Sequence, residues 1–283
     1  MKKWNLIIDV EECHNCNNCF LACKDEYVGN DIKGYSAPQP LHGHKWINIL
    51  SKERGQYPIM DIAYVPTMCN HCDDAPCVKQ GKGAIEKRND GIVIINPQKA
   101  VDRKDIVASC PYGAIWWNEE HAVPQTWTFD AHLLDRGWKE PRGVQSCPTA
   151  AMKAVKITDQ EMATLASTEK LEPLRPDLDT KPRVYYKNLH RYTKAFIAGE
   201  VLAKVNDVTD CVASATVLLS SQGQQLAATE TDPYGEFKID GLEPQSGTCS
   251  LTISHEGYST RTIDVTLEGQ SIVTNSVMLE RAP

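Results

Sequence analysis

The sequence lacks any stretch that could cross a membrane. None of its apolar runs approaches the roughly 20 residues that a transmembrane helix requires. Residues 1–5 lead into a short apolar strand, without the long apolar region and small-residue cleavage site of a signal peptide. We therefore expect a cytoplasmic protein with no membrane span.

The sequence is also poor in the features that bind nucleic acid or catalyse reactions on a substrate. The net charge is −7, and residues 195–283 hold four Lys or Arg against twelve Asp or Glu, so no basic stripe for a phosphate backbone is present. No Ser-His-Asp constellation, phosphate-binding loop or pair of catalytic carboxylates is recognisable. We therefore expect no nucleic-acid partner, and we expect any active site to lie on a partner subunit.

Cysteine, in contrast, is abundant, and nine of the eleven cysteines fall within the first 147 residues. Two closely spaced runs are present, of which the first has the bacterial ferredoxin spacing: Cys13-x2-Cys16-x2-Cys19-x3-Cys23 and Cys69-x2-Cys72-x4-Cys77. Two single cysteines, Cys110 and Cys147, each precede a proline, as the last ligand of such a run does. Spacings of this kind are typical of metal ligation and not of a disulfide scaffold.

The cysteines group into two complete sets of four. In two-cluster ferredoxins the cysteine before the proline binds the other cluster, so each closely spaced triple needs one remote partner. Cys147 is available to the first triple and Cys110 to the second. The sequence thus predicts two 4Fe–4S clusters, bound by Cys13, Cys16, Cys19 and Cys147, and by Cys69, Cys72, Cys77 and Cys110.

Two further clusters would be expected if the pattern were complete, but their ligand positions are almost entirely lost. A third cluster would use four positions that now hold Gly81, Ala100, Arg103 and Ile106. A fourth would use Cys23 and three positions that now hold Trp127, Asp130 and Gly143. Cys23 and Asp130 are the only candidates for extra iron ligands, and two ligands of four beside a bulky tryptophan do not predict a stable third cluster.

Zinc is the competing metal for these cysteines, because four-cysteine zinc sites also use C-x2-C pairs. The triple rhythm of the first run combined with a remote Cys-Pro is rare in zinc sites and typical of iron–sulfur proteins. The sequence therefore favours iron–sulfur clusters.

The predicted fold class is α+β, in three segments. Residues 1–157 should form a ferredoxin-like domain with pseudo-two-fold symmetry, because two tracts share the Cys-Pro ending. Residues 158–194 should form a helix with Thr158 as its N-cap, followed by an extended connector. Residues 195–283 should form a β-sandwich or small barrel, with strands at 197–205, 215–220, 235–239, 250–254, 260–267 and 272–279. The insertion between Cys23 and Cys69 is too irregular to assign.

Several segments together resemble a known family: residues 16–20, 91–93, 110–113, 131–135, 181–189 and 235–238. In these segments the chain is similar to the iron–sulfur subunits of the molybdopterin oxidoreductases, and most of all to the small subunits of the pyrogallol–phloroglucinol transhydroxylase branch. The C-terminal segment resembles a carboxypeptidase-regulatory or immunoglobulin-like sandwich. The resemblance implies a large catalytic partner that holds molybdenum in two pyranopterin guanine dinucleotides, and hydroxyl transfer between polyhydroxylated benzenes.

Two other functions stay open from the sequence. The chain is also compatible with an electron-transfer subunit of a molybdenum or tungsten reductase, such as an aromatic dehydroxylase or a respiratory reductase. The third hypothesis is a binding module whose clusters are purely structural. Because fold does not determine function, the choice depends on the site and the partner.

Overall fold

The computed structural model describes residues 1–283, and the chain divides into two compact units. The N-terminal unit comprises Met1–Ser51 and Tyr64–Leu189, and the C-terminal unit comprises Lys52–Ala63 and His190–Pro283. The C-terminal unit therefore includes a short piece of the insertion that precedes the second cysteine run. No helix in either unit is both long and apolar enough to span a bilayer.

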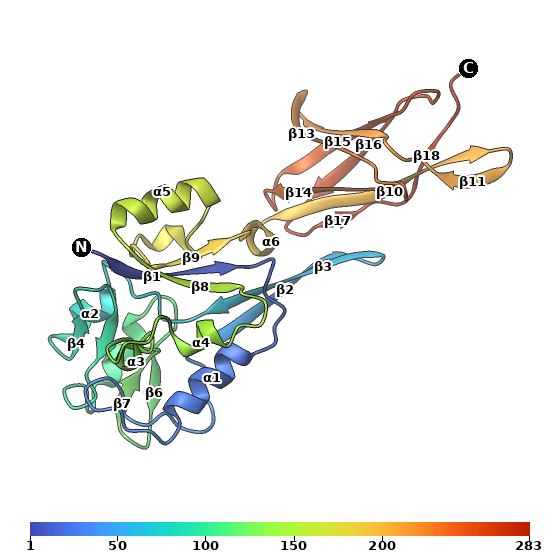
Figure 1. The fold of residues 1–283 in the computed structure, drawn as a ribbon. Coiled ribbons are helices and arrows are strands. Elements are labelled where there is room, and N and C mark those ends of the chain that lie inside the picture. Colours follow the sequence, from blue (N-terminus) through green and yellow to red (C-terminus); the bar gives the residue numbers. More distant parts are fainter. The chain divides into compact units, whose positions relative to one another are not determined.

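A three-stranded sheet and one capped helix frame the N-terminal unit (Figure 1). Strand β1 (Lys3–Asp9) lies between the antiparallel β8 (Met152–Ile157) and the parallel β9 (Val184–Lys187). Helix α5 (Asp159–Glu169) begins with a capping box, in which the Thr158 hydroxyl accepts from the Glu161 N–H and the Glu161 carboxylate accepts from the Thr158 N–H. The predicted first strand and the predicted N-cap are both confirmed.

The cysteine-bearing segments of this unit contain short helices and strands. In chain order they are α1 (Asn18–Tyr27), α2 (Pro76–Gly81), β4 (Ile85–Lys87), β5 (Val93–Ile95), the 3-10 helix η1 (Lys104–Ser109), β6 (Trp116–Asn118), β7 (Val123–Gln125), α3 (Ala131–Leu134), α4 (Arg142–Gln145) and the 3-10 helix η2 (Pro176–Leu178). β4 pairs with β5 and β6 pairs with β7, each in an antiparallel hairpin. Helix η1 ends directly before Cys110-Pro111, and α4 ends one residue before Cys147-Pro148.

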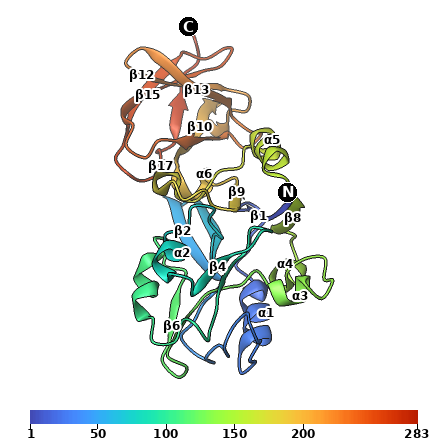
Figure 2. The same ribbon diagram turned by 90° about the vertical axis from the view of Figure 1, so that its left-hand side faces the viewer.

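The C-terminal unit is a sandwich of two sheets (Figure 2). One sheet contains β10 (Ala195–Val205) with β11 (Val208–Cys211), β14 (Glu236–Leu242), β17 (Ile272–Val273) and β18 (Val277–Leu279). The other has the order β13 (Gln224–Glu230), β12 (Thr216–Ser221), β15 (Gly247–Ser254) and β16 (Arg261–Leu267). A single apolar core, centred on residues such as Ile197, Leu219 and Leu251, lies in this unit. The predicted sandwich is confirmed, and α6 (His190–Thr193) precedes it.

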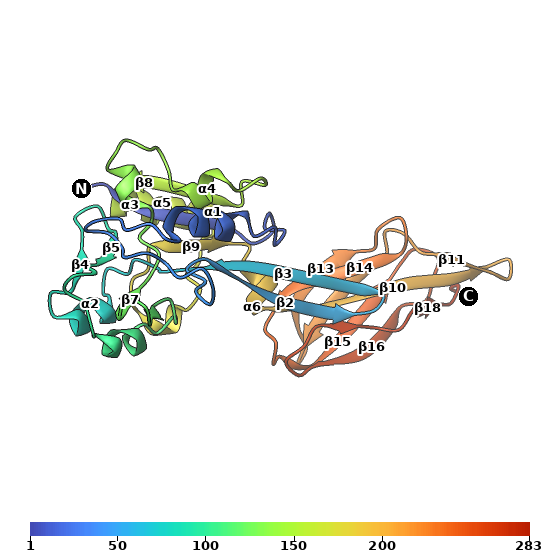
Figure 3. The same cartoon turned by 90° about the horizontal axis from the view of Figure 1, so that it is seen from below.

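The insertion contains a hairpin of β2 (Asn48–Gln56) and β3 (Ile59–Thr67), whose outer part belongs to the C-terminal unit (Figure 3). The Arg54 side chain is only 1% exposed there. Its guanidinium forms ion pairs with Asp61 and, at 2.8 Å, with Asp240 on β14. Gly55 has a φ of +79°, and a Cβ at this position would lie 2.5 Å from the Phe196 ring. Close packing therefore holds the hairpin in the sandwich unit.

Candidate metal centres

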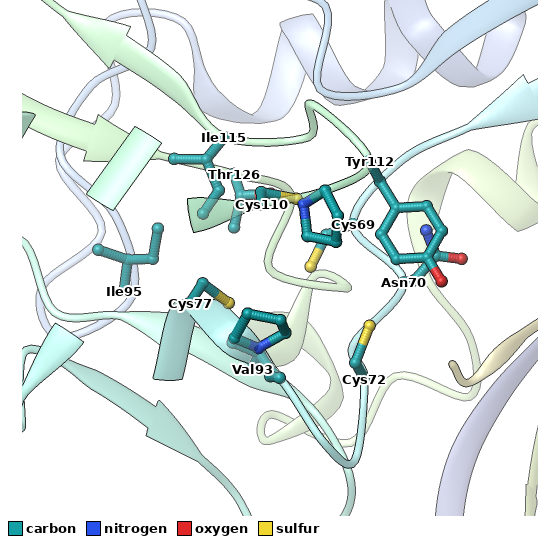
Figure 4. Close-up of a pocket in the computed structure, with 13 residues that line it drawn as sticks. Cys69, Asn70, Cys72, Cys77, Val93, Ile95, Cys110, Tyr112, Ile115 and Thr126 are labelled. Carbon is teal, nitrogen blue, oxygen red and sulfur yellow. The ribbon is translucent and has the colours of Figure 1, made fainter. Parts of the chain in front are cut away.

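The four cysteines of the second set line one cavity (Figure 4). Cys69 and Cys72 lie on the loop that follows β3, Cys77 lies in α2, and Cys110 follows η1. The remaining lining is mostly apolar, with Val93, Ile95, Ile115 and three other side chains of this kind around the thiols. Three neighbouring thiols and one remote thiol therefore line the same cavity.

Burial is the main influence on these thiols. Burial, with smaller contributions from the neighbouring Cys110 and Cys72, raises the pKa of Cys77 to about 12. The pKa of Cys69 lies well above the ordinary value, again because of burial first and then because of Cys77. The metal-free thiols of Cys69 and Cys77 therefore hold their protons at neutral pH, and iron must displace those protons to bind thiolates.

The surroundings of this cavity suit a cubane cluster. Four soft thiolates are the ligand set that a 4Fe–4S cluster requires, and an apolar lining limits access of water to it. The Ala114 N–H donates to Cys110 Sγ at 3.4 Å, which is the kind of hydrogen bond that tunes a bound cluster. No group of three or more His, Cys, Asp or Glu side chains is placed to hold a single metal ion.

The first set lies around the start of α1 and is less enclosed. Cys13 and Cys16 lie on the loop before α1, Cys19 is buried in α1, and Cys147 follows α4. Burial, with smaller contributions from the thiols of Cys13, Cys147 and Cys16, raises the pKa of Cys19 to about 12. The Asn18 side chain, next to Cys19, donates to the carbonyl of Ser146, next to Cys147, at 3.5 Å, so the first run and the remote cysteine lie side by side. Cys16 is exposed to solvent.

Packed side chains occupy the region where a complete cysteine pattern would place a fourth cluster. Trp127 is fully buried, and the Asp130 carboxylate beside it is 1% exposed. Asp130 Oδ1 accepts from the Tyr27 hydroxyl at 2.8 Å and from Trp127 Nε1 at 3.1 Å, while Oδ2 accepts from the Arg142 N–H at 2.8 Å. Both carboxylate oxygens are engaged by donors. Cys23 is buried near Asp130, and burial raises its pKa well above the ordinary value.

The region of the lost third site is filled as well. Ala100 and Ile106 are fully buried in an apolar cluster that also contains Ile85. A Cβ on Gly81 would lie 2.7 Å from Ile85 Cγ1, so a cysteine at this position would collide with the core. Arg103 turns to the backbone of α2 instead, with its guanidinium 3.3 Å from the Gly81 carbonyl.

Two residues other than cysteine support the second set. His71 is buried, and its Nδ1 accepts from the Val93 N–H at 3.0 Å while lying 3.8 Å from Cys69 Sγ. Burial lowers the pKa of His71 to about 3, and the nearby Lys87 contributes to the decrease. Thr180, which hydrogen-bonds Cys72, was missed because it lies in the connector with no signal of its own.

Comparison with known proteins agrees with this site. Residues 60–157 match the family model of a 4Fe-4S dicluster domain, and residues 197–280 match that of a carboxypeptidase regulatory-like domain. The pyrogallol hydroxytransferase small subunit of Pelobacter acidigallici is 44% identical over 262 residues, which cover 92% of this chain and 94% of that protein. This chain belongs to the family of iron–sulfur subunits of molybdopterin oxidoreductases. The family and fold predictions are thereby confirmed.

More distant relatives in the family cover less of the chain. The arsenate respiratory reductase iron–sulfur subunit of Shewanella sp. strain ANA-3 is 28% identical over 232 residues, which cover 64% of this chain and 94% of that protein. A sulfite dehydrogenase subunit of Allochromatium vinosum is 28% identical over 241 residues, which cover 77% of this chain and 98% of that protein. The lower coverage leaves part of the chain unmatched in both.

Proposed function

We propose that this chain is the cluster-bearing subunit of a cytoplasmic molybdopterin enzyme that transfers hydroxyl groups between polyhydroxylated benzenes. One observation carries the proposal: similarity to the pyrogallol hydroxytransferase small subunit extends over 92% of the chain, against 64% for the arsenate reductase subunit. In this proposal the active site, with molybdenum in two pyranopterin guanine dinucleotides, lies on a large catalytic partner.

The proposed cofactors of this chain are two 4Fe–4S clusters. Cys13, Cys16, Cys19 and Cys147 would hold one, and Cys69, Cys72, Cys77 and Cys110 would hold the other. The cavity that the second set lines and the proximity of the first set support this assignment. A bound cluster of this type accepts and donates single electrons. The residues of the chain bind it through thiolates, exclude water with apolar side chains and donate N–H groups to sulfur.

Two clusters suit a reaction that needs no electron export. Moving a hydroxyl from one benzene ring to another changes no net oxidation state, so no external electron acceptor is consumed. Side chains fill both regions where further clusters are expected from the cysteine pattern, with Trp127 in one and Ile106 in the other. A complete chain of four clusters, which long-distance electron transfer would use, is therefore not part of the proposal.

Electron transfer in a reductase is the second candidate, because the arsenate reductase and sulfite dehydrogenase subunits share the cluster-bearing part of the chain. The two candidates differ in their need for an electron donor or acceptor. With a second polyhydroxylated benzene present as hydroxyl donor, a hydroxytransferase should convert pyrogallol in the purified complex without either, whereas a reductase should be inactive until an electron donor is added.

The deciding experiment combines composition and turnover of the complex purified under anoxic conditions with its native partner. We expect about eight irons and eight acid-labile sulfides on this subunit, since each cluster contributes four of each. We also expect pyrogallol conversion without an added redox partner. Zinc in place of iron would overturn the cluster assignment, and strict dependence on an electron donor would overturn hydroxyl transfer.

A further inference from the structure

Each cysteine set depends on a contact between two helices that are remote in sequence. In the first set, α1 carries Cys19, and α4 ends just before Cys147. In the second set, α2 carries Cys77, and η1 ends just before Cys110. The fourth thiol can reach the other three only if the paired helices stay together. Any group that fastens α1 to α4, or α2 to η1, therefore controls the geometry of the ligand set.

Arg142 fastens α4 to α1. Its guanidinium donates to Glu26 Oε2 and to Asp25 Oδ2, each at 2.6 Å. Its backbone N–H donates to the buried Asp130, whose other oxygen accepts from the hydroxyl of Tyr27 at the end of α1. His132 Nε2 also lies 2.7 Å from Glu26 Oε1. The contact is thus built from several charge-assisted hydrogen bonds, and part of it is shielded from water.

The same contact passes close to the first ligand set. Gly143, next to Arg142, packs against α1 so closely that a Cβ there would lie 3.7 Å from the Cys19 Cβ. Asn18 at the start of α1 also reaches the Ser146 carbonyl, one residue before Cys147, at 3.5 Å. A change in the distance between α1 and α4 would therefore move Cys147 relative to Cys19.

Arg103 fastens η1 to α2 in the other half of the unit. Its guanidinium donates to the Gln80 carbonyl at 3.0 Å and to the Gly81 carbonyl at 3.3 Å, which are the last residues of α2. Asp105 in η1 accepts two hydrogen bonds from Arg103 at 2.8 Å and one from the Gln80 amide at 2.7 Å. The two contacts differ in the burial of one partner: Asp105 is 44% exposed, whereas Glu26, one of the two carboxylates that Arg142 contacts, is 18% exposed and the other, Asp25, is 71% exposed.

We propose that Arg142 and Arg103 are positioning residues, one for each cluster. Each arginine joins the helix that carries the third ligand to the short helix that precedes the remote fourth ligand. Both arginines lie where a further cluster would join the same segments in a complete cysteine pattern. Arg103 occupies a ligand position of the third site, and the Arg142 backbone N–H donates to Asp130, which occupies a ligand position of the fourth site. The inference rests on the proposed pair of clusters and adds a distinct residue to each.

The test exchanges each arginine for glutamine and follows the two clusters separately in the purified complex. Cys147→Ser and Cys110→Ser variants first assign the electron paramagnetic resonance signal of each reduced cluster. Iron removal by a ferrous chelator and redox titration are then followed signal by signal. Each arginine variant is the matched control for the other, because both replace a partly exposed arginine in the same unit.

We expect each arginine variant to affect one cluster and to leave the other unchanged. Arg142→Gln should speed iron loss from the first cluster roughly tenfold, because a partly shielded, charge-assisted contact is removed. Arg103→Gln should speed iron loss from the second cluster by a smaller factor, roughly threefold, since exposed ion pairs are weaker. Each variant should also shift the midpoint potential of its own cluster alone. Lysine in place of either arginine should restore part of the effect, because it keeps the charge but not the planar fork.

Other outcomes separate the possible failures. Equal changes at both clusters in each variant would mean general destabilisation and would overturn the positioning role. Unchanged rates and potentials in both variants would overturn it too. A wild-type complex without two reducible clusters would overturn the proposed cofactors themselves, and it would do so before any variant is made.

Discussion

The backbone N–H of Arg142 donates a hydrogen bond to Asp130 Oδ2 at 2.8 Å, in the middle of what the cysteine pattern marks as a lost cluster site. In a cluster-bearing site this stretch of chain would be held by iron. Here the Asp130 side chain, which is 1% exposed, joins these segments by accepting hydrogen bonds from Tyr27 and Trp127 as well as from Arg142. The position that the cysteine pattern would assign to a cluster holds a buried polar network that must stay fully hydrogen-bonded.

Replacing that carboxylate should be costly. In Asp130→Ala, the Tyr27 hydroxyl, the Trp127 N–H and the Arg142 N–H each lose an acceptor. A buried donor without a partner costs about 1–3 kcal/mol. We therefore expect the free energy of unfolding of Asp130→Ala to fall by about 3 kcal/mol after local relaxation. The urea midpoint of the near-ultraviolet circular dichroism signal measures it. The exposed Asp177→Ala serves as the control and should leave the midpoint unchanged.

The cysteine sets predict iron losses that depend on the position changed. Cys110→Ser should remove about four irons by disabling the second set, and Cys147→Ser should remove about four by disabling the first. Cys23→Ala should keep the full iron content, because Cys23 is buried beside Asp130 in a packed region. Iron and acid-labile sulfide quantitation measures all three. A loss of iron in Cys23→Ala would reveal a further cluster.

In the sandwich unit, the buried guanidinium of Arg54 predicts a large effect of its removal. Arg54→Gln leaves Asp61 and Asp240 with one cation fewer, and breaking a buried ion pair from one side costs about 3–5 kcal/mol. Because Lys238 and Arg191 still contact these carboxylates, we expect the loss of stability to lie near about 3 kcal/mol, the low end of that range. Hydrogen–deuterium exchange of peptides from β10 and β14 measures the loss of protection. Arg281→Gln, at an exposed position, should not change the exchange.

The same ion pairs predict an acid-sensitive sandwich. Burial raises the pKa of Asp61, but hydrogen bonds from Arg191 and Arg54 outweigh it and hold the pKa well below its ordinary value. A carboxylate with a depressed pKa stabilises the folded state above its unfolded pKa of about 3.9, and this stabilisation is lost as the pH falls further. Protection of β14 should therefore decline below about pH 4, and the decline should be shallower in Arg54→Gln. An equally steep decline in the variant would contradict this assignment.

The sequence predicted much of this molecule where the signal was local. The cysteine spacing grouped four thiols that line one cavity, Cys69, Cys72, Cys77 and Cys110, and Thr158 with Glu161 predicted the helix start. β13 was not predicted because most of its side chains are exposed and give no apolar alternation. The polar β2 was missed for the same reason, since it has only one fully buried residue, Arg54.

Other features could not be predicted because their partners are remote. Asp130 gave a weak signal as an iron ligand, and only the fold shows that Tyr27 and Arg142 occupy its oxygens. Arg103 looked like a simple loss of a ligand, although it holds the carbonyls at the end of α2. Pairings of this kind depend on tertiary packing, which no local pattern records.

The hairpin arm at Lys52–Ala63 has a consequence for the order of events during synthesis. Arg54 leaves the ribosome 186 residues before its partner Asp240, whereas Asp61 follows it at once. At translation speeds of about 5–20 residues per second, the arm waits roughly 10–40 seconds for the strand that completes its ion pairs. During synthesis Arg54 can therefore pair with Asp61 well before Asp240 is available. A version of the chain shortened before β14 would lack Asp240, and Arg54 would keep only one of its two carboxylate partners.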